Sequence, residues 1–225
     1  MTSIYAQTLG RDFERLHPRI RERFGWCSAD GVAAIGEGEM YTIWHAPWAA
    51  APLAIGARRH ILFPHSGRDI PFTVENYAYR DRYGRETVTW IRTFRFADRI
   101  RRFDATMIRS ARRGGIVDYL GTRQHLAVDL ELAVSPQGGL RIRSGEQRVY
   151  EGRIGFRWPN RLTGAADVHE WYDEEQDRYR IEVKVANRWL GPIFYYSGAF
   201  RSRLMPLGLR AVPLDARPLR EEARE

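Results

Sequence analysis

The chain has 225 residues, of which 44% are hydrophobic and 12% aromatic, so it can bury the core of one large domain. This composition excludes an intrinsically disordered chain. The formal net charge is +8, but the basic residues are interleaved with acidic ones, as on an ordinary solvated surface. The single cysteine, Cys27, excludes an internal disulfide and is typical of a reducing compartment, so we predict a cytoplasmic protein.

The N-terminal segment predicts helices. Residues 3–24 carry hydrophobic side chains at helical spacing with charged residues between them. Gly10 and Pro18 interrupt the pattern, so we expect two short helices that form a cap from residue 1 to residue 26. The start of the chain lacks the apolar run of a signal peptide, and no stretch approaches the length of a transmembrane helix.

The first strand is predicted at residues 32–45, where Met40 and Trp44 share a face. Residues 47–62 follow, rich in alanine and interrupted near Pro52 and Gly56. They predict a short helical pair, which serves either as a lid over an open sheet end or as a plain crossover.

Residues 72–96 contain two strand-like runs joined by a turn. In the second run Val88, Trp90 and Phe94 share one face, and Arg92 points the same way. A charged group on an apolar face needs a partner, a ligand or water. Arg92 therefore either clamps a carboxylate or phosphate headgroup, or forms a structural ion pair. The carboxylates that we consider for such a pair are those of Asp104, Asp118 and Glu170.

From residue 70 to residue 201 the chain is almost wholly strand-like. About ten strands at short, turn-marked spacing predict an antiparallel sheet that must close or fold over. The predicted fold class is mostly β: a calycin-like antiparallel β-barrel or clam, with N-terminal helices and a short helical insert after the first strand. We predict a single domain over residues 1–205 and a mobile tail over residues 206–225.

A barrel of this kind leaves room for a small ligand, which aromatic side chains can line. Aromatic residues at strand spacing are, however, more often part of an ordinary core. Asp167 and His169 share a face, but no second pair at ligand spacing accompanies them, so no metal site is predicted. No motif indicates a cofactor or a catalytic residue. The predicted ligand-binding residues are Arg92, Trp90, Trp44, Phe94, Tyr195, Glu170 and Met107.

The densest basic run, residues 98–113, holds six arginines on a strand and its turns. Basic strands with aromatic residues can bind single-stranded nucleic acid. No standard nucleic-acid-binding signature accompanies this run, so we predict no nucleic-acid partner.

Motifs along nearly the whole chain form a recognisable series. They include GEGEMYTIW at 36–44, ENYAYRD at 75–81, TWIRTFRF at 89–96, HLAVDLELAV at 125–134 and ADVHEWYD at 166–173. The series resembles a bacterial family of domains of unknown function, sometimes appended to saccharopine-dehydrogenase-like reductases. The resemblance implies a reductase-type protein as a possible partner, and it brings no catalytic residues.

The leading hypothesis is that the barrel binds a small, largely apolar or amphipathic, anionic ligand, with Arg92 at the headgroup and tryptophans around the tail. The order of strand, helical pair and meander is similar to that of fatty-acid-binding and lipocalin-like barrels, an analogy of architecture alone. Two alternatives stay open: an isomerase or lyase that uses the same cavity, and a regulatory module that acts for a reductase.

Overall fold

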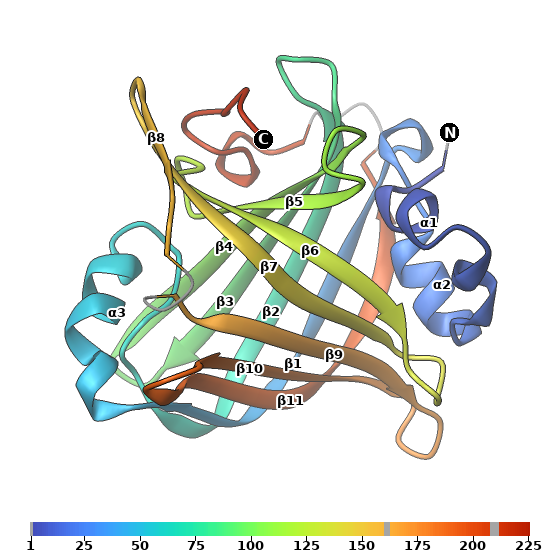
Figure 1. Ribbon diagram of the computed structural model, residues 1–225. Helices are drawn as coiled ribbons and strands as arrows, with labels where there is room; N and C mark the ends of the chain where they lie inside the picture. The colour runs from blue at the N-terminus through green and yellow to red at the C-terminus, as the bar shows by residue number, and fades with distance from the viewer. Residues whose placement is uncertain (1, 160–162, 208–211) are drawn as a thin grey trace.

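The computed structural model describes residues 2–159, 163–207 and 212–225, and its main feature is a closed ring of ten antiparallel strands (Figure 1). An eleventh strand forms a hairpin outside the ring. The strands are β1 (Val32–His45), β2 (Gly67–Arg80), β3 (Glu86–Phe96), β4 (Arg99–Ser110), β5 (Gly115–Leu120), β6 (Leu126–Val134), β7 (Leu140–Glu151), β8 (Ile154–Arg157), β9 (Ala165–Asp173), β10 (Arg178–Asn187) and β11 (Gly191–Pro206).

Neighbours in the chain are neighbours in the ring. From β1 to β7, each strand pairs with the next strand in the chain. β7 also pairs with β9, β9 pairs with β10, β10 pairs with β11, and β11 pairs with β1, which closes the ring. The outlying β8 pairs with the end of β7. Each strand of the ring is thus paired with a neighbour on both sides, which is how many short strands bury one apolar face. The prediction of a mostly β antiparallel barrel is confirmed.

The N-terminal helices lie against one end of the barrel, on the right in Figure 1. Pro18 is the first residue of the second helix, where its missing N–H costs no hydrogen bond. Apolar residues of both helices are buried, including Ile4 and Ile20. The helices therefore close this end. They are α1 (Ile4–Leu9), the 3-10 turn η1 (Gly10–Arg15) and α2 (Pro18–Phe24).

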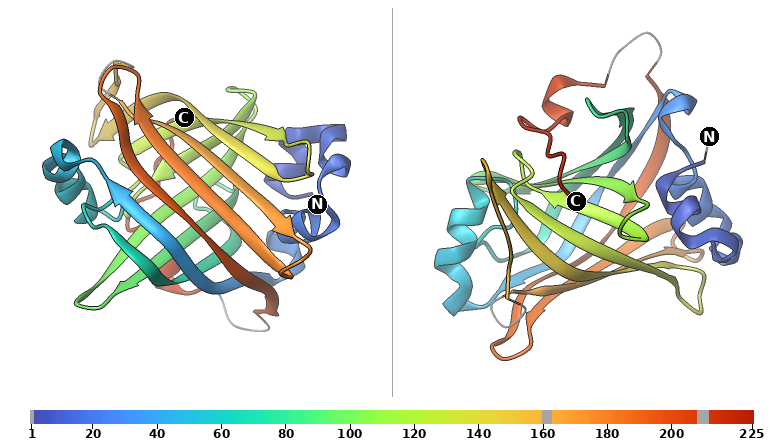
Figure 2. Two further views of the ribbon diagram at one scale, coloured as in Figure 1. Left: turned by 90° about the horizontal axis from the view of Figure 1, so that it is seen from below. Right: turned by 45° about the horizontal axis from the view of Figure 1, so that its top comes forward.

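The helical insert follows β1, as predicted, and lies at the opposite end of the barrel in each view (Figures 1 and 2). It consists of a 3-10 turn, η3 (Pro47–Ala49), and one helix, α3 (Ala50–Ala57). Pro52 does not divide the insert into two helices, because it occupies the first turn of α3, where an N–H has no intrahelical partner.

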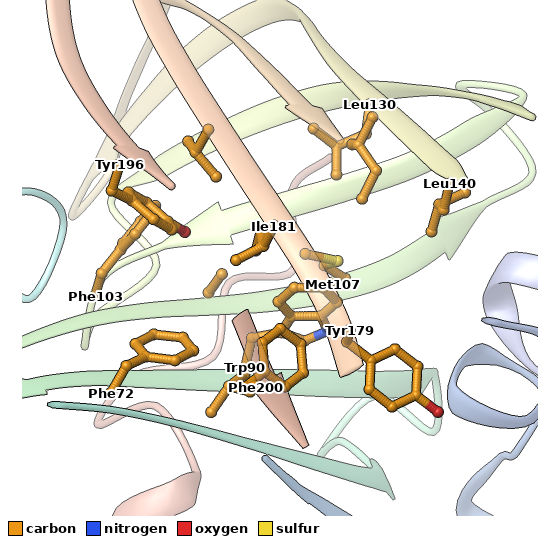
Figure 3. Packing of buried hydrophobic residues seen from close by; sticks show 14 of the residues in the cluster. Phe72, Trp90, Phe103, Met107, Leu130, Leu140, Tyr179, Ile181, Tyr196 and Phe200 are labelled. Atoms are coloured by element: carbon orange, nitrogen blue, oxygen red, sulfur yellow. The ribbon is translucent and has the colours of Figure 1, made fainter. Parts of the chain in front are cut away.

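Part of the barrel interior is packed with aromatic rings from β2, β3 and β11 and from the connection between α3 and β2. The ring of Phe94 lies 5.0 Å from that of Phe63, 5.1 Å from Phe72 and 5.4 Å from Tyr196, measured between centroids. Figure 3 shows Phe72 and Tyr196 at this side of the interior, with Leu130 and Leu140 at a distance from them. Large buried rings of this kind dominate the energetics of a core.

The C-terminal residues lie on the outside of the barrel. Val212 and Ala216 are buried in a cluster with Ile91 of β3. Farther on, Leu219 N donates to Thr122 O at 2.7 Å. The described part of the tail therefore covers the outer face of β3, which explains why both faces of that strand are buried. The mobility of residues 206–225 and the boundary at residue 205 stay predictions.

Candidate functional site

A cavity of about 240 Å³ lies inside the barrel, beside the aromatic cluster. Strands β3 to β7 and β9 to β11 form its wall, together with the connection between α3 and β2. Most of the lining side chains are aliphatic. Among the described residues, four polar side chains line it: Arg92, Asp118, Ser144 and Gln147. Such a cavity, apolar with few polar groups, is the usual form of a small-molecule site.

Arg92 lies in this wall because the alternation of β3 points it inward with Trp90. Its side chain is buried, and the guanidinium carbon lies 3.6 Å from the centroid of the Phe103 ring. Within the described residues no ion pair forms to Arg92, and its Nε has no hydrogen-bond partner. A buried charge without a partner is unfavourable, so this guanidinium is suited to receive an anion.

Asp118 lies in the same wall, on β5, opposite Met107 of β4. Burial raises the pKa of its carboxyl to about 7, against the opposing effect of the positive charge of Arg92. In the described part of the chain its Oδ1 has no hydrogen-bond partner. Near neutral pH this carboxyl therefore changes between an acid that can donate a hydrogen bond and an anion that offsets the charge of Arg92.

Tyr196 supplies a third buried polar group at this place. Burial raises the pKa of its hydroxyl, and the charge of Arg92 and the contact between its guanidinium and the hydroxyl oppose that effect. No described residue forms a hydrogen bond of acceptable geometry with the hydroxyl. A guanidinium, a carboxyl and a phenol that each keep an unsatisfied atom make a site where a polar ligand group would find partners.

The cavity is bordered by the place where β7 and β9 part, which we infer to be its mouth. These strands pair only over four residues, from Leu140 with Glu170 to Arg143 with Asp167. Beyond that point two side-chain bonds hold the seam: Ala166 N donates to Ser144 Oγ, and Gln147 Nε2 donates to Gly164 O, each at 2.7 Å. Ser144 and Gln147 thus use their side chains in hydrogen bonds across the seam. Of the four polar lining residues, Arg92 and Asp118 are the ones with a buried atom, Nε and Oδ1, that forms no hydrogen bond to a described residue.

Two other predicted residues, Trp90 and Met107, also line the cavity. The N-terminal cap orients both of them, because Tyr5 OH accepts from Trp90 Nε1 at 2.8 Å and donates to Met107 Sδ at 3.3 Å. Figure 3 shows Met107 next to the indole of Trp90. Phe94 lies in the aromatic cluster beside the cavity, rather than in its wall.

Glu170 is buried, but it belongs to a different arrangement. Its carboxylate forms an ion pair with Arg23 of α2, and Arg23 Nη1 donates to Ser202 Oγ at 3.1 Å. Burial raises the pKa of Glu170, whereas the charge of Arg23 lowers it. The hydrophobic spacing of residues 3–24 does not distinguish Arg23 from the arginines that face solvent. From the sequence, Glu170 is a candidate partner of Arg92, whereas the structure pairs it with Arg23.

Trp44 and Tyr195 lie on the outer face, which corrects the expectation that they line the cavity. β1 has a bulge at Tyr41, where the pairing with β11 passes from Met40 to Thr42, and the bulge reverses the alternation that follows. Trp44 is consequently 40% exposed. Tyr195 lies directly across from it and bonds to Glu182 outside the barrel. The tyrosine that points inward is its neighbour in the chain, Tyr196.

In residues 2–159, 163–207 and 212–225, no three His, Cys, Asp or Glu side chains are arranged to hold a metal ion. Over the same residues, each helix is too short or too polar to span a bilayer.

The sequence matches a known family along most of its length. Residues 16–200 match the family described as "domain of unknown function (DUF4166)". The chain belongs to this family. It is also 32% identical over 203 residues to the uncharacterized protein YndH of Bacillus subtilis (strain 168), which covers 89% of this chain and 97% of that protein. Neither description mentions a reductase, so that part of the resemblance stays a prediction.

Proposed function

We propose that this member of the DUF4166 family binds a small, largely apolar, anionic ligand inside the barrel, with the anionic group on Arg92. The observation that carries the proposal is the buried guanidinium in the wall of an apolar cavity, with an Nε that lacks a partner among the described residues. A carboxylate there would accept the hydrogen bonds that the protein leaves unmade, and such charge-assisted bonds are the strong ones.

The cavity indicates the size and character of the ligand. Its volume of about 240 Å³ lies somewhat below the range of roughly 300–1,000 Å³ that is common for drug-sized ligands. The aliphatic and aromatic walls favour a hydrocarbon body. A medium-chain carboxylic acid combines both features, so decanoate is a suitable probe.

Asp118 makes binding depend on pH. When its carboxyl is neutral, it can donate a hydrogen bond to the ligand, and the charge of Arg92 is available to the anion. When it is ionised, it repels a carboxylate ligand and offsets Arg92. Because burial raises its pKa to about 7, we expect decanoate to bind more weakly as the pH rises through that value.

The experiment compares three probes that share a tail: decanoate, decanol and decyltrimethylammonium. Retention is measured by native mass spectrometry, and affinity by the change in tryptophan fluorescence, to which Trp90 in the cavity wall contributes. We expect decanoate to bind best and the cation worst, and Arg92→Met to remove the preference. Arg95→Met, an exposed arginine of the same strand, is the matched control. Equal binding of the three probes, or a cavity that holds only water, would contradict the proposal.

One observation favours a second candidate, an isomerase that acts on an unsaturated acid in the same cavity. A carboxyl with a pKa of about 7 is well suited to general acid–base work at neutral pH. With the carboxylate of a 3-enoic acid on Arg92, Asp118 would remove a proton from C2 and return it to C4, which gives the 2-enoic acid.

Solvent deuterium distinguishes the two candidates. An isomerase would place deuterium in the recovered acid and shift its double bond, and Asp118→Asn would abolish both changes. A protein that only binds the acid would return 3-decenoic acid without deuterium and with its double bond in place. The Asp118→Asn variant of such a protein would still bind 3-decenoic acid.

A further inference from the structure

Helix α3 lacks a polar face although it lies at the surface. Its sequence, AAPLAIGA, contains no polar side chain. Leu53 is its buried residue, whereas Ala51, Pro52, Ala54 and Ile55 are exposed, Ile55 by 64%. A surface helix of a globular protein ordinarily turns charged and polar residues toward water. The exposed side of α3 is therefore suited to an apolar partner.

The turn between β10 and β11 adds a second exposed apolar segment. Trp189 is 66% exposed and Leu190 is 61% exposed. The turn lies next to the start of the helical insert, because Ala46 N donates to Ile193 O at 2.9 Å and the last residue of β1 pairs with Phe194. Figures 1 and 2 show the turn and α3 at the same end of the barrel. We call the exposed residues of this end the apolar rim: Trp48, Ile55, Trp189 and Leu190.

The apolar rim borders the cavity. Ile61 and Leu62 follow α3 in the chain, and Ile193 follows the turn; all three line the cavity and are half-buried. The rim is therefore next to the inferred mouth, because Gly164 at the seam lies against Ile193. The N-terminal helices cover the opposite end of the barrel.

The charge around the rim is positive. Residues 40–68 and 183–200, which supply the rim, contain no aspartate or glutamate, and Arg58, Arg59 and Arg188 are exposed there. One of these, Arg59, has a carboxylate of Glu151 at 3.9 Å. Basic residues that flank exposed tryptophan and aliphatic side chains match the surface of a bilayer that contains anionic lipids. Tryptophan in particular favours the membrane–water interface.

We propose that the apolar rim docks on the surface of an anionic lipid bilayer, with the mouth of the cavity turned toward the lipid. What would pass through the mouth rests on the proposed function, that is, an anionic amphipathic ligand for Arg92. The docking itself rests on the rim, its charge and its position, and it can be measured with no ligand present.

The test is co-sedimentation of the protein with vesicles of phosphatidylcholine mixed with phosphatidylglycerol, against vesicles of phosphatidylcholine alone. We expect binding to the mixed vesicles, weakened by added salt. Trp189→Ser/Leu190→Ser should lower the affinity on the order of 100-fold, since two large apolar side chains leave the lipid. The turn itself should persist, because Asn187 Oδ1 accepts from the backbone N–H groups of residues 189 and 190. Arg58→Gln/Arg188→Gln should cost about fivefold for each arginine.

The matched control is Leu204→Ser/Met205→Ser, which removes two adjacent exposed apolar side chains at the far end of β11. It should sediment as the parent does. The proposal is overturned if the parent protein does not co-sediment with the mixed vesicles. It is also overturned if Trp189→Ser/Leu190→Ser binds these vesicles with the same affinity as the control variant. It is overturned in favour of a second copy of the chain if the parent forms a dimer that the rim variant abolishes while neither protein binds lipid.

Decanoate separates this proposal from the function on which it draws. The Trp189→Ser/Leu190→Ser variant should still bind decanoate in solution but should no longer bind the vesicles. Arg92→Met should still bind the vesicles but should no longer bind decanoate. Vesicle binding without decanoate binding would leave the docking intact and reject the ligand.

Discussion

Two buried arginines of this protein, Arg23 and Arg92, have opposite surroundings. Arg23 reaches in from α2, forms an ion pair with Glu170, donates to Ser202 and lies 4.8 Å from the centroid of the Phe200 ring. Arg92 stacks on an aromatic ring as well and interacts through its charge with Asp118 and Tyr196, but no carboxylate of the described residues forms an ion pair with it, and none of these residues bonds to its Nε. At the end that α2 covers, the protein thus supplies a carboxylate that pairs with the buried Arg23. In the cavity, the described residues supply no ion pair for the buried Arg92.

The difference separates an arginine that holds the fold together from one that is available to a ligand. Removal of one partner from a buried ion pair leaves an uncompensated charge, which is strongly destabilising. Removal of a buried charge that has no partner takes away an unfavourable group. The two residues should therefore respond in opposite ways to the same substitution.

The largest effect is expected for Arg23→Met. The substitution leaves the carboxylate of Glu170 buried without its cation, and we expect the free energy of unfolding to fall by about 3–5 kcal/mol. Urea denaturation measures the change. Arg23→Met/Glu170→Met should recover most of the loss, because it removes both charges. A loss below about 1 kcal/mol for the single variant would show that the pair is not structural.

Arg92→Met should reverse this pattern. We expect stability to stay the same or rise, while the affinity for decanoate falls on the order of 100-fold with the loss of two charge-assisted hydrogen bonds. Urea denaturation and fluorescence titration on one preparation give both values. The comparison fails if Arg92→Met destabilises the protein as much as Arg23→Met does.

Asp118→Asn tests the surroundings of Arg92 through the dependence of folding stability on pH. The folded protein holds the pKa of Asp118 at about 7, above the ordinary value of 3.8, so the folded state favours the neutral acid. Stability due to this group is therefore greatest at low pH, falls as the pH rises from 3.8, and is fully lost above about 7. Asparagine stays neutral throughout.

The advantage of Asp118→Asn over the parent should consequently grow by about 2–3 kcal/mol between about pH 5 and pH 8. Thermal or urea unfolding at both values measures it. Asp129→Asn is an informative control, because arginines lower the pKa of that half-buried carboxyl, which is therefore ionised in the folded and the unfolded protein from about pH 5 to pH 8, and the difference from the parent should stay constant. A constant difference for Asp118→Asn across this range would show that the carboxyl titrates at its ordinary pKa.

The smallest expected effect is that of Tyr5→Phe at the closed end. The variant leaves the indole N–H of Trp90 without its acceptor, which should cost about 1–2 kcal/mol of stability. The affinity for decanoate should change less than that of Arg92→Met, since the indole stays in the cavity wall. A larger loss of binding than of stability would make the N-terminal cap part of the site.

The sequence predicted the barrel and the inward direction of Trp90 and Arg92 because both follow from local alternation. It misplaced Trp44, because the bulge at Tyr41 leaves no local mark. It selected Tyr195 where Tyr196 points inward, although alternation with Phe194 and Phe200 favours the even positions. The ion pair of Glu170 with Arg23 and the lack of a hydrogen-bond partner for Asp118 Oδ1 among the described residues depend on which distant segments of the chain meet. The alternation of hydrophobic residues along a strand carries no information about such contacts.

The most direct test of the account is to locate the carboxylate of bound decanoate in a crystal of the complex. We expect the hydrocarbon chain in the cavity and a carboxylate oxygen about 3 Å from Arg92 Nε. A carboxylate that lies at the mouth or on the outer surface, or a cavity that stays without decanoate at saturating concentration, would contradict it.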